Sequence, residues 1–148
     1  MKVKTLRFGE VEVPDGMVFC LTGGLIGFPL LKRFVILEHK PGSQFRWLQS
    51  VDDPDFAFVV IDPLLLAPDY PLDRLRDAVA DGHQGSSEVV VAAITTVPPE
   101  PEPITVNLMA PVAFNAVSRV GAQIVLHDGH YSARHVLART GSASSPTT

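Results

Sequence analysis

Residues 34–61 read FVILEHKPGSQFRWLQSVDDPDFAFVVI, and the architecture follows from this segment. It contains three runs rich in β-branched and aromatic residues, at 34–38, 45–50 and 56–61, and these residue types favour strands. The two gaps between the runs are filled with Pro, Gly, Ser and Asp, which are typical of turns. The segment therefore predicts three consecutive strands, of which 56–61 is apolar throughout.

The same kind of pattern continues on both sides of this segment. Further strands are expected at Glu10–Val13, Met17–Leu21, Val89–Thr96, Val112–Val117 and Gln123–His127. Thirteen prolines and eleven glycines are scattered along the chain, so the elements between them must be short. Asp128-Gly129 predicts a two-residue hairpin, because a type I′ turn needs positive φ at both central positions.

Helical spacing is convincing in one segment only. Leu72, Leu75 and Val79 recur at i, i+3 and i+7, with charged residues on the opposite side. The glycine-rich segment 24–31 is a weaker candidate for a helical turn. Many short strands with one short helix predict a mainly β fold, a small antiparallel β-barrel-like single domain over residues 1–140. Residues 141–148, rich in Gly, Ser, Pro and Thr, predict a disordered C-terminal tail.

Composition restricts the class of protein. The chain has 148 residues, 46% hydrophobic and 19% charged, which is typical of a globular domain. The single cysteine, Cys20, rules out an internal disulfide and suits a buried apolar position. The apolar runs are far shorter than the roughly 20 residues that span a bilayer, and the start lacks the apolar stretch of a signal peptide. We expect a cytoplasmic protein without a membrane partner.

Charge is concentrated in the middle of the chain. The net charge is −4, but residues 52–81 hold eight aspartates and two arginines, which gives this segment −6. Such a balance argues against direct nucleic-acid binding, since phosphate contacts come from Lys and Arg. An acidic segment would instead attract a basic protein partner. The alternative is that these aspartates only line solvated loops.

Catalytic and cofactor motifs are absent from the sequence: it has no P-loop, no G-x-S-x-G and no H-E-x-x-H. His127, His130 and His135 near Asp128 have the residue types of a zinc site, but the expected exposure of this turn favours solvated histidines. The segment 52–55 favours turn-type backbone bonding over acid–base chemistry. We expect no enzyme activity, no metal and no cofactor.

A series of short motifs resembles the flagellar assembly factor (FliW) family. The motifs are Gly24-Leu25-Ile26-Gly27-Phe28 with Arg33-Phe34, Phe45-x-Trp47-Leu48-Gln49-Ser50, Asp52-Asp53-Pro54, Asp69-Tyr70 and Thr105-Val106-Asn107-Leu108-Met109-Ala110-Pro111. Each motif is weak alone, but their order and spacing from about residue 8 to residue 137 make the resemblance specific. Ile26 departs from it, because the family often has proline there.

The resemblance implies a function as well as a fold. Members are small β-barrel-like cytoplasmic proteins of bacteria without enzyme activity. They bind newly made flagellin and also the carbon storage regulator CsrA, a small basic dimer that represses translation. Once flagellin has been exported, the free factor antagonises CsrA. Two alternatives to this function are a small β-barrel that binds a small ligand or cofactor in its mouth and a generic protein-interaction adaptor.

Two groups of candidate residues follow. The partner-binding candidates, aspartates for attraction and aromatics as anchors, are Trp47, Asp52, Asp53, Asp55, Asp69, Tyr70 and Asp73. For Trp47 a core position is an equal alternative. The motif residues expected to serve the architecture are Gly24, Leu25, Gly27, Phe28, Asn107, Leu108 and Pro111. Here the glycines permit positive φ, Asn107 braces a turn and Pro111 fixes the entry into a strand.

Overall fold

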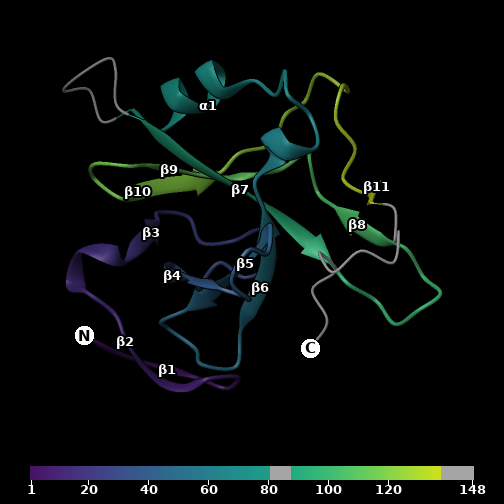
Figure 1. Ribbon diagram of the computed structural model, residues 1–148. Helices are drawn as coiled ribbons and strands as arrows, with labels where there is room; N and C mark the ends of the chain where they lie inside the picture. The colour runs from purple at the N-terminus through teal and green to yellow at the C-terminus, as the bar shows by residue number, and fades with distance from the viewer. Residues whose placement is uncertain (81–87, 138–148) are drawn as a thin grey trace.

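The computed structural model describes residues 1–80 and 88–137 (Figure 1). Its strands are β1 (Lys2–Thr5), β2 (Gly9–Glu12), β3 (Phe19–Leu21), β4 (Arg33–Glu38), β5 (Phe45–Ser50), β6 (Ala57–Ile61), β7 (Val89–Thr96), β8 (Ile104–Val106), β9 (Val112–Asn115), β10 (Val120–Gln123) and β11 (His135–Leu137). Its helical segments are the 3₁₀ turns η1 (Asp15–Met17) and η2 (Pro63–Leu65) and the helix α1 (Leu72–Ala78). The predicted mainly β fold is confirmed.

Seven strands within the described residues form a closed barrel. Their hydrogen-bonded order is β7-β6-β5-β4-β3-β10-β9, and β9 pairs back with β7. Strands β4, β5 and β6 come from the segment 34–61 and pair antiparallel, with Ile36 opposite Leu48 and Leu48 opposite Phe58. One pair departs from the expected antiparallel arrangement, because β3 and β10 run parallel.

Two further pairs of strands lie outside the barrel. The first half of β7 pairs with β9 and its last residues pair with β8, so β8 and its neighbour β11 extend the sheet beyond the barrel. Strands β1 and β2 form a separate hairpin, and Val3 of β1 and Val13, just after β2, pack against Val35 of β4. Figure 1 shows this hairpin and α1 on opposite sides of the barrel.

The strand period of two places apolar side chains on both faces of the barrel sheet. Phe34, Leu48 and Val60 point into the barrel and pack with inward residues of β3, β7 and β9. Alternate residues such as Phe45 and Ile61 point outward and pack with Tyr70, Leu75 and Leu108 under the helical segment. Helix α1 is therefore fixed to the outside of the barrel by its apolar face.

The hairpin predicted at Asp128-Gly129 is wrong. A turn does form there, with Gly129 at φ +77°, but the strands expected on either side of it do not pair. The strand expected at 123–127 lies instead at Val120–Gln123, where it pairs with β3 and β9, and β11 pairs with β8. Pairing with strands distant in sequence thus overrides the local turn signal.

The segment 24–31 is a tight turn and contains no helix. Leu25 and Phe28 form an isolated bridge, in which the backbone N–H of Phe28 donates to the Leu25 carbonyl at 2.8 Å. Gly24 has φ +71°, and a Cβ there would lie 2.4 Å from the Pro29 carbonyl oxygen. The tail predicted at 141–148 lies outside the described residues, so it and the 1–140 boundary stay predictions.

Candidate partner-binding surfaces

The turn between β5 and β6 carries three of the candidate aspartates. Asp52 Oδ2 accepts hydrogen bonds from the backbone N–H groups of Lys32 and Arg33, both at 2.9 Å, and Oδ1 accepts one from Arg33 Nε at 3.1 Å. Burial alone would raise the pKa of Asp52, but these bonds together hold it below its ordinary value. Asp52 therefore ties the turn to Lys32 and to the first residue of β4.

Asp53 and Asp55 keep their charges available. The Asp53 carboxylate accepts a bond from the Asp55 backbone N–H at 3.0 Å, and the Asp53 N–H donates to Ser50 Oγ at 2.9 Å. This is the expected turn-type bonding, and it is confirmed. Neither carboxylate forms an ion pair with a residue in the described ranges. Both therefore present uncompensated negative charge at the end of β5.

The single acidic patch expected from residues 52–81 is split by the fold. Asp69 and Asp73 belong to the α1 region, where Tyr70 packs beside Phe45 at the start of β5. Asp52–Asp55 follow the other end of the same six-residue strand, and the two ends of that strand are roughly 17 Å apart. Asp73 is also paired with Arg76 at 2.6 Å. Asp81 lies outside the described residues.

The two proposed aromatic anchors are buried. The side chains of Trp47 and Tyr70 are each 4% exposed. Arg7 from the β1–β2 hairpin covers the Trp47 ring, with its guanidinium 4.2 Å from the ring centroid. The Tyr70 hydroxyl donates to the Leu108 carbonyl, and burial raises the pKa of this phenol. Neither ring has the exposure that an interface anchor needs, and for Trp47 the core alternative holds.

An exposed apolar surface appears where only architecture was expected. Ile26, Phe28 and Leu30 are 60%, 38% and 83% exposed. The Phe28 ring lies 5.2 Å from that of Phe56 and 5.6 Å from that of Phe58, measured between centroids. A groove of about 450 Å³ adjoins Ile26 and Phe28. Exposed apolar patches mark interaction sites. The sequence feature that could have indicated this patch is the alternation of three large apolar residues with Gly and Pro over residues 26–30.

The other motif residues hold the backbone. Asn107 Oδ1 accepts hydrogen bonds from the backbone N–H groups of Met109 at 3.1 Å and Ala110 at 3.0 Å. This is the bracing geometry of an Asx turn. Leu25 and Leu108 are buried, and the Pro111 carbonyl accepts a bond from Ile124 at 2.9 Å. Gly27 has φ +88° and nothing near the place of a Cβ.

The histidine turn does not assemble a metal site. Within residues 1–80 and 88–137 no group of three His, Cys, Asp or Glu side chains could hold a metal ion. Asp128 instead bonds to Arg74 at 2.9 Å, and that bond lowers its pKa. His127 and His130 are exposed, while His135 begins β11. The same ranges contain no helix long and apolar enough to cross a membrane.

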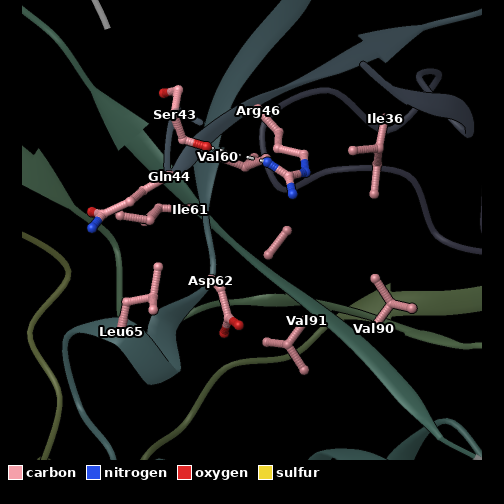
Figure 2. Close-up of a pocket in the computed structure, with 11 residues that line it drawn as sticks. Ile36, Ser43, Gln44, Arg46, Val60, Ile61, Asp62, Leu65, Val90 and Val91 are labelled. Carbon is pink, nitrogen blue, oxygen red and sulfur yellow. Dashed lines mark hydrogen bonds between the residues drawn. The ribbon is translucent and has the colours of Figure 1, made fainter. Parts of the chain in front are cut away.

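A second cavity lies where β6 ends beside β7 (Figure 2). Its volume is about 310 Å³, and Ile36, Val60 and Val90 form part of its apolar wall. Arg46 and Asp62 are the charged residues that line it. Like the groove beside Ile26 and Phe28, this cavity is large enough for a small ligand.

Comparison with known proteins identifies the family. The family model described as FliW protein matches residues 2–137. The chain belongs to this family. A flagellar assembly factor FliW from Natranaerobius thermophilus is 39% identical over 139 residues, covering 93% of this chain and 92% of that protein. A second one, from Treponema denticola, is 36% identical over 146 residues, covering 97% of this chain and 98% of that protein.

The fold of the FliW family is matched as well. A crystal structure of the flagellar assembly factor FliW aligns with a TM-score of 0.76 and 30% sequence identity, over 93% of this chain and 97% of the other. The predicted family and the predicted barrel are thereby both confirmed.

Proposed function

We propose that this FliW-family protein is a non-catalytic, cytoplasmic partner-switching factor. It binds newly made flagellin, and after flagellin has been exported it antagonises the translational repressor CsrA. Flagellin synthesis is thereby coupled to flagellum assembly. The observation that carries the proposal is the family match over residues 2–137, together with nearly full-length similarity to proteins named flagellar assembly factors.

The charge distribution supports an interaction with a basic partner such as CsrA. Asp53, Asp55 and Asp69 have no ion pairs with residues in the described part of the chain. Unpaired surface charge of one sign accelerates association with a partner of the opposite sign and makes that association sensitive to salt. Asp52 and Asp73 contribute less, since each is already paired with an arginine.

The apolar segment supports protein binding of a second kind. Ile26, Phe28 and Leu30 offer side chains that a partner would remove from water, at about 25 cal/mol for each Å². Hydrogen bonds hold the segment in place, among them one from the Ile26 N–H to Gln123 Oε1 at 2.8 Å. A surface that is already ordered loses less entropy on binding.

Calorimetry with purified flagellin and purified CsrA tests the function. Each is expected to bind with a Kd of about 1 μM or tighter, and saturation with flagellin is expected to abolish the CsrA heat. The partner-switching function is refuted when neither protein binds. Binding of both partners at once, with no mutual effect on affinity, would contradict the switch.

Charge reversal tests the electrostatic contribution. The double variant Asp53→Lys/Asp55→Lys is expected to associate with CsrA more slowly at low salt, and to approach the wild-type rate once salt screens the charges. The matched control is Glu38→Lys/Glu88→Lys, which reverses two exposed charges elsewhere. Stopped-flow measurement gives the association rate of each variant with CsrA. If the rate of the aspartate variant at low salt equals that of the wild type, these aspartates do not contribute to the interface.

Apolar-to-polar substitution tests the segment 24–31. Ile26→Ser/Leu30→Ser is expected to weaken the affinity for at least one of the two partners. The control Val117→Ser/Val136→Ser replaces comparably exposed side chains. Such surface changes alter stability by only about 0.5 kcal/mol, so a loss of binding reports on contact. Equal affinities for both double variants would exclude the segment.

A further inference from the structure

The cavity of Figure 2 lies where the pairing between β6 and β7 ends. They pair only through Val59–Ile61 and Ala93–Thr95. After Ile61 the chain turns into η2, while β7 begins four residues before Ala93. Val90 and Ala92 pair with β9 on one edge, but β6 no longer runs along their other edge, and they line an open space of about 310 Å³.

Two opposite charges line this space. Arg46 stands directly opposite Val60 across β5 and β6, and Asp62 follows Val60 by two residues. Asp62 lies one residue past the end of β6 and caps η2, and both charged side chains line the same cavity. The strand rise and spacing place their Cα atoms roughly 8 Å apart. In Figure 2 the guanidinium of Arg46 lies above the carboxylate of Asp62, and both residues line the cavity.

Neither charge is neutralised by its surroundings. The sole side-chain hydrogen bond of Arg46 among the described residues is a long one, 3.5 Å from Nη1 to the Ser43 carbonyl. It makes no ion pair there, not even with its cross-strand neighbour Glu38. Asp62 Oδ1 accepts a hydrogen bond from the Leu64 backbone N–H at 3.0 Å, and no cation within the described ranges pairs with it. The cavity thus offers one cationic and one anionic group to a ligand.

We propose that this cavity binds a free aliphatic α-amino acid. The ligand carboxylate bonds to the planar guanidinium of Arg46, and its ammonium group bonds to Asp62. The side chain packs against Ile36, Val60 and Val90. The volume lies at the low end of the roughly 300–1,000 Å³ of ligand pockets, which suits an amino acid better than a nucleotide. A peptide lacks one of the two charges at each terminus. This binding is independent of the partner-switching function.

Calorimetry with three related small molecules tests the proposal. L-leucine carries both charges, 4-methylpentanoate lacks the amino group and 3-methylbutylamine lacks the carboxylate. L-leucine is expected to bind with a Kd of about 1 mM or tighter. Each analogue is expected to bind at least about tenfold more weakly, because it leaves one charged group of the cavity unpaired.

Two variants assign the contacts. Arg46→Gln is expected to lower the affinity for L-leucine about tenfold while leaving that for 3-methylbutylamine unchanged. Asp62→Asn keeps an oxygen for the Leu64 N–H, and it should lower the affinity for L-leucine while leaving that for 4-methylpentanoate unchanged. The controls Arg134→Gln and Asp77→Asn change exposed residues outside the cavity lining. Circular dichroism verifies that each variant is folded.

Three results would overturn the proposal. The first is an absence of binding heat with L-leucine up to about 10 mM, ten times the expected Kd. The second is equal affinity for all three molecules, which would show that the charges play no part. The third is wild-type affinity in both cavity variants, which would place the amino acid elsewhere on the protein.

Discussion

Three glycines allow the cost of an added methyl group to be separated into torsion and space. Gly27 has φ +88° but open space at the position of a Cβ, whereas Gly24 has φ +71° and the Pro29 carbonyl oxygen 2.4 Å away. Gly121 has no positive φ, yet a Cβ there would meet the Ala113 carbonyl oxygen at 1.8 Å. Substitution by alanine thus tests backbone torsion alone at Gly27, torsion and steric space together at Gly24, and steric space alone at Gly121.

The structure sets the expected order of these losses. Gly27→Ala should cost about 1–2 kcal/mol, the penalty of a left-handed conformation with a Cβ. Gly24→Ala adds a backbone clash worth roughly a further 1–3 kcal/mol. Gly121→Ala forces β9 and β10 apart, because 1.8 Å is far inside van der Waals contact. Its cost should reach about 3 kcal/mol or more, at the upper end of overpacking.

Urea unfolding followed by the fluorescence of Trp47 measures these differences. Trp47 is the single tryptophan and is buried, so its emission reports loss of the native state. Each kcal/mol corresponds to a fall in Tm of about 2–4 °C. Equal losses in Gly24→Ala and Gly27→Ala would refute the argument from space at Gly24. A Gly121→Ala protein as stable as wild type would refute it at the β9–β10 pair.

Three further substitutions test single contacts. Asp52→Ala should cost about 1 kcal/mol of folding free energy, like the loss of a helix cap. Because the pKa of Asp52 is lowered in the folded state, this stabilisation is present above about pH 4 and is lost as the pH falls. The urea midpoint of the variant should therefore change less with acid pH than that of the wild type. Tyr70→Phe leaves the Leu108 carbonyl unpaired and should cost about 1–3 kcal/mol. Since burial raises the Tyr70 pKa, wild-type stability should fall as the pH rises above about 10, and a Tyr70→Phe protein with the same alkaline slope would contradict this. Arg7→Ala removes a cation–π contact worth about 0.5–1 kcal/mol. It should also increase the quenching of Trp47 fluorescence by acrylamide. Unchanged quenching would show that Arg7 does not shield the ring.

Local pattern was sufficient for the central strands and the helix. The three runs of β-branched and aromatic residues in 34–61, with turn residues between them, predicted β4, β5 and β6 in order, because residue types and turn residues are local properties of the chain. Local pattern was insufficient for β10 and β11, which obtain their hydrogen bonds from β3, β9 and β8. Asp128-Gly129 illustrates the limit, since its turn formed but no hairpin followed.

The candidate site shows the same division. The types and order of the residues were sufficient to predict the family and to show that aspartates are concentrated in residues 52–81. They also correctly assigned residues 52–55 to a turn. Folding then carried Asp53 and Asp69 to opposite ends of β5, covered Trp47 with a hairpin, and left Leu30 in solvent. A sequence specifies backbone torsions and which face of an element is apolar. Which other element covers that face, and which charges remain unpaired, depends on contacts between residues distant along the chain, and these exist only once the barrel has closed.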